Sequence, residues 1–348
     1  MFPRRPINLW ALTLALTAAL TTSTLAQSST EETQIWLPLV PQQRSTDLGT
    51  LGGRTSVAYA LNNQNQVTGS SVNAANEGHP FVWSPASGMQ QIGNDDEYGA
   101  GNAINNHGHV AGSLRDTSNR TEAFFWTPEQ GAQNLGTLGE DYSEAFGIND
   151  QDQVVGFATV AGGHAAFIWE PQAGMRSLGT LGGRRSIAYD INNDGQVVGS
   201  SEATNGTPRA FIWTEATGMQ ELSTPQGEWS SAVSINDRGE VIGQRIDDQG
   251  HDHWFYWSTT TGAVDLVTRG CYLTGISSIN NRGQIAGDWL NGRGSFTAAF
   301  CQPDGPINSL GTASEVRSYA TDINDHGNVV GATLHEQGYN HATLWGTD

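Results

Sequence analysis

Residues 177–200 read SLGTLGGRRSIAYDINNDGQVVGS, and this stretch contains the phrase that decides the fold. The phrase is a small residue, Ile or Leu, an Asn, a tight turn and then Val/Ile-x-Gly. It occurs seven times, at a spacing of 43 or 44 residues. The Asn falls at Asn62, Asn105, Asn149, Asn192, Asn236, Asn280 and Asn324. Regularity at such a period is typical of repeat architectures.

Each copy of the repeat contains four short apolar segments bounded by Gly, Asn, Asp or Pro. This pattern indicates strands and turns, and no segment has a helical period. The step from Asn192 to Gly195 suits a tight hairpin, because Asn and Gly tolerate the positive φ that such turns require. Four strands per copy, repeated seven times, predict an all-β, seven-bladed β-propeller of four-stranded antiparallel blades. The alternative is a linear β-solenoid, whose rungs are usually shorter.

The two ends of the repeat region complement each other. It begins with an outermost strand at 45–50 that has no blade of its own. It ends with a third strand at 341–345 that has no partner. We therefore expect the N-terminal strand to pair with the last blade and close the ring, which removes exposed strand edges. The strand that leads to the repeat Asn is then innermost, beside the central channel.

A Trp follows the Gly of each phrase, with one exception. The positions are Trp83, Trp126, Trp169, Trp213, Trp257, Cys301 and Trp345. A residue that recurs in nearly every blade is expected to pack in the core between blades rather than to form a ligand platform. Cys271 lies in the same repeat as Cys301, so a disulfide and a pair of buried thiols both remain open.

The first 26 residues have the features of a Sec-type signal peptide. Arg4 and Arg5 form a basic region, an apolar stretch covers 9–20, and small residues end at Ala26. The apolar stretch is too short to cross a bilayer, although an uncleaved anchor is the alternative. We expect a signal peptide at 1–26, a linker or N-terminal extension at 27–44 and the propeller at 45–348. The protein is then secreted to the extracellular space or the periplasm.

The charge of the chain narrows the classes of partner. The formal net charge is −19 at pH 7. A strongly acidic surface argues against nucleic acid or anionic lipid as partner. We expect a monomer with no membrane insertion after signal cleavage.

Three phrases carry a family resemblance. Leu-Gly-Thr-Leu-Gly-Gly stands at 48–53 and 178–183 and, shortened, at 135–139, and it is followed by Ala-x-x-Ile-Asn-x-x-Gly-Gln-Val-Val-Gly. A His-Ala-Phe-x-Trp phrase appears at 164–169. Together these phrases resemble the HAF repeat family of bacterial extracellular proteins, with a WD-like organisation, over residues 46–346. The sixth copy departs most, with Ala299 and Cys301 in place of Phe and Trp. The resemblance implies secretion and repetition, and it supplies no reaction.

Two short motifs have residue types that bind metals. Residues 190–195 look like the front half of a calcium loop, but the twelfth position, which should be a bidentate acid, is Ser201. His251, Asp252 and His253 offer ligands on one strand. Other His residues recur at or near the position of His253, four before the Trp: His79, His164 and His341. We therefore expect turns and structural His residues, no metal site and no cofactor, with Ca²⁺ left as the open alternative.

The loops that contain Leu-Gly-Gly and those between second and third strands are expected to build one face. Binding groups concentrate on loops of a rigid scaffold. The residues that break the repeat there are Arg54, Glu97, Asp141, Tyr142, Arg184, Arg185, Glu228, Trp229, Tyr272 and Arg317. We expect this face to bind a glycan, a peptide or a cell-surface partner without catalysis.

Two other functions remain open. Glu97, Asp141 and Glu228 each stand eight residues before the repeat Asn, so they are expected at one mouth of the channel. Converging carboxylates suit an extracellular hydrolase or lyase, or Ca²⁺. The sequence has no phosphate-binding Gly-Lys-Ser/Thr loop, nucleophile elbow or Cys-x-x-Cys, so we do not expect an enzyme. The third possibility is a structural component of a surface layer.

Overall fold

The computed structural model describes residues 44–224, 229–292, 294–302, 305–311, 317–335 and 337–346. The predicted signal peptide, residues 27–43 of the predicted extension and the candidate Glu228 lie outside the described residues. Within the described part of the chain, no helix is long and apolar enough to cross a membrane.

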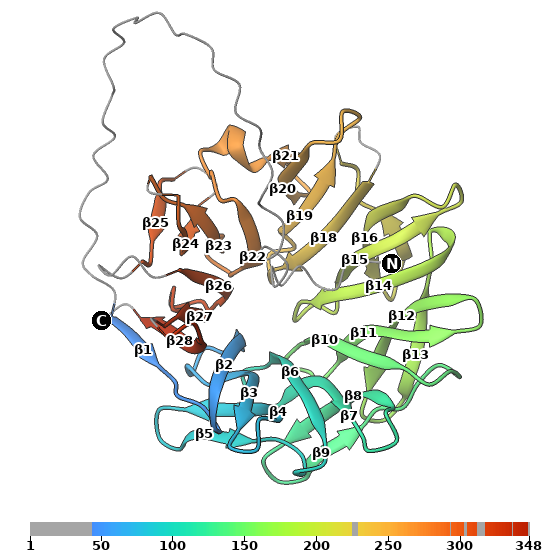
Figure 1. Ribbon diagram of the computed structural model, residues 1–348. Helices are drawn as coiled ribbons and strands as arrows, with labels where there is room; N and C mark the ends of the chain where they lie inside the picture. Colours follow the sequence, from blue (N-terminus) through green and yellow to red (C-terminus); the bar gives the residue numbers. More distant parts are fainter. Residues whose placement is uncertain are drawn as a thin grey trace, which may run out of the picture.

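The described residues form an all-β propeller of four-stranded antiparallel blades (Figure 1). Five sheets are separate and have four strands each. In four of these sheets the strands are consecutive along the chain. The first contains β2 (Gly52–Leu61), β3 (Val67–Asn73), β4 (Gly78–Ser84) and β5 (Gly88–Gln91), and the second contains β6 (Tyr98–Ile104), β7 (Val110–Arg115), β8 (Thr121–Thr127) and β9 (Gly131–Asn134). The third contains β18 (Trp229–Ile235), β19 (Val241–Ile246), β20 (Asp252–Ser258) and β21 (Gly262–Asp265), and the fourth contains β22 (Gly275–Ile279), β23 (Ile285–Leu290), β24 (Phe296–Cys301) and β25 (Ile307–Ser309). The fifth combines both chain ends: β1 (Arg44–Asp47), β28 (Asn340–Gly346), β27 (Val329–Leu334) and β26 (Ser318–Ile323). A 3-10 helix, η1 (Leu266–Arg269), connects β21 to β22.

The remaining strands belong to one eight-stranded sheet. It contains β10 (Ser143–Ile148), β11 (Val154–Val160), β12 (Gly163–Glu170), β13 (Gly174–Gly179), β14 (Gly182–Ile191), β15 (Val197–Ala203), β16 (Pro208–Thr214) and β17 (Gly218–Glu221). The prediction of seven separate four-stranded blades therefore differs from the structure, which has five separate four-stranded blades beside this eight-stranded sheet. The cause is one parallel pair, His164 with Arg185, that joins β12 to β14. Gly163 permits this approach, because a Cβ there would lie only 2.5 Å from the carbonyl oxygen of Arg184.

The Gly of the repeated phrase is required by close packing within each blade. In β15, a Cβ on Gly199 would clash with the carbonyl oxygen of Ile187 in β14. The same clash with a backbone oxygen would occur at Gly69, Gly112, Gly156, Gly243, Gly287 and Gly331. A register shift follows in the first strand of every unit, as between Ala188 and Asp190. Such bulges increase the local twist and redirect side chains.

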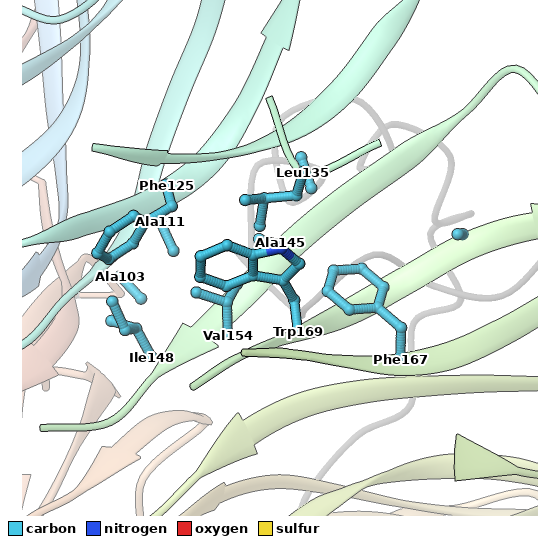
Figure 2. Packing of buried hydrophobic residues seen from close by; sticks show 11 residues of the cluster. Ala103, Ala111, Phe125, Leu135, Ala145, Ile148, Val154, Phe167 and Trp169 are labelled. Carbon is cyan, nitrogen blue, oxygen red and sulfur yellow. The ribbon is translucent and has the colours of Figure 1, made fainter. Parts of the chain in front are cut away.

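The hydrophobic core lies between neighbouring sheets. In the cluster of Figure 2, Trp169 is 5% exposed and packs with Phe125, Leu135, Ile148 and other residues. The ring centroids of Phe125 and Trp169 are 5.4 Å apart. The other repeat Trp residues pack in corresponding clusters, which confirms their predicted structural role.

The predicted closure of the ring is confirmed. β1 pairs antiparallel with β28, and Ser45 lies opposite Trp345. The pairing continues beyond the strand, because the Leu48 N–H donates to the Ala342 carbonyl oxygen at 2.9 Å. Leu48 is buried with Phe81 and residues of the last sheet. Residues almost 300 positions apart therefore form one continuous strand pair.

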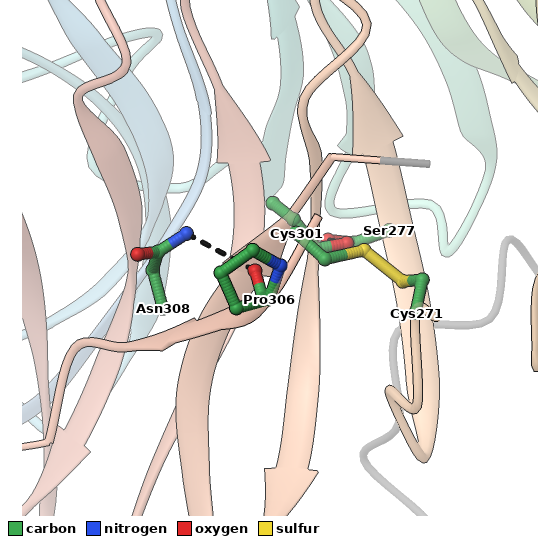
Figure 3. Close-up of a disulfide and its surroundings, with 6 residues drawn as sticks. Cys271, Ser277, Cys301, Pro306 and Asn308 are labelled. Atoms are coloured by element: carbon green, nitrogen blue, oxygen red, sulfur yellow. Dashed lines mark hydrogen bonds between the residues drawn. A yellow bond between two sulfur atoms is a disulfide. The ribbon is translucent and has the colours of Figure 1, made fainter. Parts of the chain in front are cut away.

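The two cysteines form a disulfide, with a Cα–Cα distance of 5.8 Å (Figure 3). Cys301 occupies the place that Trp has in the other repeats, and it is fully buried. Cys271 comes from the connection after η1 and packs in the same cluster, beside Leu266 and Ile276. The disulfide and this connection together fill the space that a Trp fills elsewhere.

Reduction of this disulfide is expected to lower the free energy of unfolding by about 3.5 kcal/mol, because a 30-residue loop gains freedom in the unfolded chain. Chemical denaturation of the wild type and of Cys271→Ser/Cys301→Ser measures the loss. Dithiothreitol should shift the wild type to the stability of the double variant and leave the variant unchanged. A wild type insensitive to reductant would contradict the expectation.

Candidate functional site

The Asn of each repeat organises its own turn and also contacts the next unit. Asn192 Oδ1 accepts hydrogen bonds from the backbone N–H groups of Asp194, at 3.1 Å, and Gln196, at 2.9 Å. Its Nδ2 donates to the carbonyl oxygen of Asn236, at 3.0 Å. Asn192 is 3% exposed. One buried side chain therefore satisfies two donors of its turn and one acceptor of the neighbouring turn.

The bond from one Asn to the next runs around the whole molecule. Each repeat Asn donates from Nδ2 to the carbonyl oxygen of the next, over 2.8–3.1 Å. The last bond returns from Asn324 to Asn62. We call these residues the inner Asn ring: Asn62, Asn105, Asn149, Asn192, Asn236, Asn280 and Asn324.

The residue after each repeat Asn belongs to a second ring. The backbone N–H of each member donates to the side-chain oxygen of the next, over 2.7–3.0 Å. We call it the amide–carboxylate ring: Asn63, Asn106, Asp150, Asn193, Asp237, Asn281 and Asp325. Like the first ring, it closes from the last unit to the first.

Amides and carboxylates alternate in this second ring. Asp237 Oδ2 accepts from Asn193 Nδ2 at 3.1 Å and from Asn281 Nδ2 at 2.9 Å. Asp150 and Asp325 each accept in the same way from an Asn on either side. The alternation fails between Asn63 and Asn106, whose amide nitrogens donate away from each other, to Asp325 and Asp150.

Two further carboxylates lie beside the rings. Asp190 Oδ2 accepts from Ser234 Oγ at 2.7 Å and from the Ile235 N–H at 3.0 Å. Asp322 Oδ2 accepts from the Leu61 N–H at 3.0 Å. These residues and both rings line a hollow of about 180 Å³ at this end of the channel. Asp190 is thus directed to the neighbouring unit, and residues 190–195 form a bulge and a turn.

Most predicted binding residues lie at the opposite ends of the innermost strands. Arg54, Arg184 and Arg185 are early in their strands, and Trp229 begins β18. Glu97, Tyr142 and Arg317 each immediately precede the first strand of a unit, and Asp141 stands one residue before Tyr142. We call this end of the propeller the loop face. These residues therefore lie at the same end of the propeller, as expected from their positions in the repeat.

Tyr272 stands three residues before β22, the first strand of its unit, at the same repeat position as Asp141. It lies beside Cys271 in the connection between η1 and β22, and it is 61% exposed. Figure 1 shows η1 at the periphery of the molecule.

Several residues of the loop face make defined contacts. Arg54 Nη1 donates to the Tyr339 hydroxyl at 2.7 Å, and its guanidinium lies 5.4 Å from the centre of that ring. The Tyr142 hydroxyl donates to Glu144 at 2.8 Å, and its ring stacks on Phe157. Arg184 and Arg317 are exposed. The face therefore combines charged and aromatic groups.

Of the three acids in the predicted acidic site, the structure describes Glu97 and Asp141. Glu97 Oε2 accepts from the backbone and side-chain N–H groups of Asn94, at 2.9 and 3.1 Å. Glu97 thus holds a local turn, while Asp141 is exposed. The third acid, Glu228, lies outside the described residues.

Of the recurrent His residues, His79 contacts the next unit, as expected of a structural His. His79 is fully buried, and its Nδ1 lies 2.8 Å from the Glu97 carbonyl oxygen of the next unit. His253 Nε2 lies 3.0 Å from Asp247 Oδ2. The hydrogen bond from the His251 backbone, followed by that from the His253 side chain, holds the pKa of Asp247 well below its usual range. Asp247 rather than Asp252 is thus the partner of both His residues.

Sequence reasoning missed two groups. The amide–carboxylate ring was visible as an invariable Asn or Asp after each repeat Asn, but we interpreted that position only as part of a turn. The second group is Asp47, His335 and His341, which we call the closure trio. Each offers a ligand atom within 4.8 Å of the other two. The sequence shows no local signal for it, because Asp47 is far from both His residues along the chain.

Comparisons with known proteins identify the fold and no family. Neither protein-family models nor curated protein sequences match this chain. The β-propeller domain of the Trilobed protease from Pyrococcus furiosus is similar, with a TM-score of 0.59, 10% identity, and coverage of 85% of this chain and 97% of that domain. Puromycin hydrolase is similar with a TM-score of 0.54 and 13% identity, and the match covers 84% of this chain and 52% of that chain. TolB from Acinetobacter baumannii (TM-score 0.50, 11% identity) is covered over 66% of its length by 75% of this chain. At such identities the likeness shows the fold alone, so this chain is a β-propeller similar in architecture to these proteins.

Proposed function

We propose that the protein is a non-catalytic binding propeller whose loop face takes a glycan, a peptide or a cell-surface partner. One observation carries the proposal, namely the difference between the two ends of the channel. At one end, nearly identical residues of every unit are occupied in two closed rings of hydrogen bonds. At the other end, the side chains differ from unit to unit in charge and aromatic character.

The chemistry of the loop face favours a polar partner with some apolar surface. Exposed Arg184 and half-buried Trp229 stand at the beginnings of two neighbouring innermost strands. Arg and Trp are enriched among the residues that dominate binding energy at interfaces. A glycan ring or a peptide side chain can stack on Trp229 while Arg184 donates hydrogen bonds to it.

We further infer that the chain acts as seven repeated units, with the eight-stranded sheet counting as two blades. A single residue pair joins its halves, and each half supplies one member to each ring of hydrogen bonds. The seven repeats also support our proposal that the chain belongs with HAF repeat proteins. We propose in addition that residues 1–26 export it, since they combine a basic region with a short apolar stretch and small residues. Detection of the protein in the culture medium or periplasm, and its loss without residues 1–26, would test export.

Substitution of the loop face is expected to weaken binding. We predict that Arg184→Ala/Trp229→Ala reduces affinity for a ligand found on a glycan array or in a peptide library by at least about tenfold, which corresponds to about 1.4 kcal/mol. Isothermal titration calorimetry measures the affinity.

Arg282→Ala is the matched control, because Arg282 is exposed beside the two hydrogen-bonded rings at the opposite end. Equal affinities for the double variant and the wild type would contradict the choice of face. Equal losses in both variants would show a general effect on the fold. No ligand in either screen would contradict the binding proposal itself.

A further inference from the structure

Three side chains meet where the ring closes, in an arrangement that suits a metal ion. Asp47 ends β1, His341 lies in β28, and His335 lies in the turn between β27 and β28. We propose that this closure trio binds a divalent transition-metal cation such as Zn²⁺ and thereby links the N-terminal strand to the last two strands. The site is separate from the loop-face binding function proposed above.

Both imidazoles face the same carboxylate oxygen. Asp47 Oδ2 lies 2.8 Å from His341 Nδ1 and 3.5 Å from His335 Nε2. The two imidazole centroids are 4.2 Å apart. Zn²⁺ binds His nitrogen and carboxylate oxygen at about 2.0–2.2 Å, so neighbouring ligand atoms in a tetrahedral site are about 3.4 Å apart. Small side-chain rotations therefore suffice to bring the three atoms to one ion.

The type of ligand selects the class of ion. Two imidazoles and one carboxylate suit Zn²⁺ and similar transition metals. Ca²⁺ prefers six to eight oxygen ligands, and in the trio only the Asp47 carboxylate supplies oxygen. Asp47, His335 and His341 are 45%, 44% and 25% exposed in their side chains. An ion from solution can therefore reach the site, and water can complete its coordination.

The ligands are held in place by neighbouring backbone groups. Asp47 Oδ1 accepts from the Gly49 N–H at 2.8 Å, which leaves Oδ2 directed at the two His residues. The turn that carries His335 is closed by its own backbone, because the His335 N–H donates to Tyr339 and its carbonyl oxygen accepts from Gly338, both at 2.8 Å. Such supporting contacts orient metal ligands.

A second group of similar composition is a weaker candidate. His107, His109 and Asp152 also offer ligand atoms within 4.8 Å of one another. However, Asp152 Oδ1 already accepts from His109 Nδ1 at 2.7 Å and from Asn105 Nδ2 at 2.8 Å. Asn105 belongs to the inner Asn ring, so an ion bound there would compete with a buried hydrogen bond. At the closure trio an ion would replace only the exposed hydrogen bond between His341 Nδ1 and Asp47 Oδ2.

Metal binding at the trio would stabilise the closure itself. In the free protein His341 Nδ1 lies 2.8 Å from Asp47 Oδ2, so Nδ1 carries the proton that the carboxylate accepts. To bind the ion, the neutral ring carries its proton on Nε2 instead, and the Nδ1 lone pair and Asp47 Oδ2 both turn to the ion. The ion then bridges β1 and β28. Because the full site exists only when β1 is paired, local opening of β1 becomes less frequent by the factor 1 + [M]/Kd.

The test uses Zn²⁺ alone and measures amide hydrogen exchange in the purified protein. At a free Zn²⁺ concentration of 100 times Kd, exchange in residues 44–48 should slow by about a hundredfold. The melting temperature should rise by about 5 °C. Ca²⁺ at the same concentration should change neither quantity.

Variants locate the effect. His335→Gln changes an exposed turn residue, so it should fold as the wild type and lose the response to Zn²⁺. His326→Gln, at another exposed His, and His107→Gln, in the second group, should keep the response. The proposal is wrong if His335→Gln still responds in full, or if His107→Gln abolishes the response. It is equally wrong if Zn²⁺ binds the wild type without slowing exchange in β1.

Discussion

Deletion of residues 44–48 is expected to open the ring and to lower the free energy of unfolding by about 5 kcal/mol. Loss of the buried Leu48 side chain alone corresponds to about 2–5 kcal/mol. Its hydrogen bond to Ala342 and the pairing of β1 with β28 are lost as well. Trp345, which is fully buried, then loses the strand beside it. The melting temperature should fall by about 10 °C.

The control deletion ends at residue 43, immediately before β1. It should melt within about 2 °C of the full chain, because it leaves the strand pair intact. Similar melting temperatures for the two deletions would contradict a stabilising role for the closure. Adding a peptide of residues 44–50 to the protein that lacks residues 44–48 should restore part of the loss.

Substitution of one member of the inner Asn ring is expected to have an effect of similar size. Asn192→Ala removes the partner of two backbone N–H groups in its own turn and of the Asn236 carbonyl oxygen. A buried polar group without a partner costs about 1–3 kcal/mol, and the two turn N–H groups are only partly buried, so the total loss should be about 3–5 kcal/mol. Chemical denaturation measures it.

Two further variants separate the causes of that loss. Asn192→Asp keeps the acceptor for the turn but replaces the donor to Asn236 with an oxygen, so it should remain clearly less stable than the wild type. Asn205→Ala removes a single exposed turn contact, with Thr207, and should cost less than about 1 kcal/mol. An Asn192→Asp protein as stable as the wild type would show that the bond between units contributes nothing.

The architecture was largely predictable because the repeat states it many times. Strand alternation, the Asn turn and the incomplete ends at residues 45–50 and 341–345 led directly to four-stranded units and to the strand pair of β1 with β28. The pairing of Cys271 with Cys301 stayed open, because spacing alone does not show whether two cysteines face each other. The link between His164 and Arg185 was also not predictable, since it depends on an absent side chain at Gly163.

The candidate sites were predictable only in part. Positions at strand ends can be read from the repeat, so Arg54, Arg184 and Trp229 were correctly grouped. Contacts between units depend on the curvature of the ring, which no local pattern contains. Asp47 and His341 became neighbours only through closure.

The amide–carboxylate ring poses a problem of parity. Amides and carboxylates can alternate strictly only around a ring with an even number of positions. This ring has an odd number, so two neighbours must be of the same kind. One like pair is unavoidable, and the chain places it at Asn63 and Asn106, where two neutral amides meet. Asn63→Asp would only move the defect to the junction with Asp325 and turn it into two facing carboxylates. The seam therefore marks the least costly point in an arrangement that no substitution at a single position can make perfect.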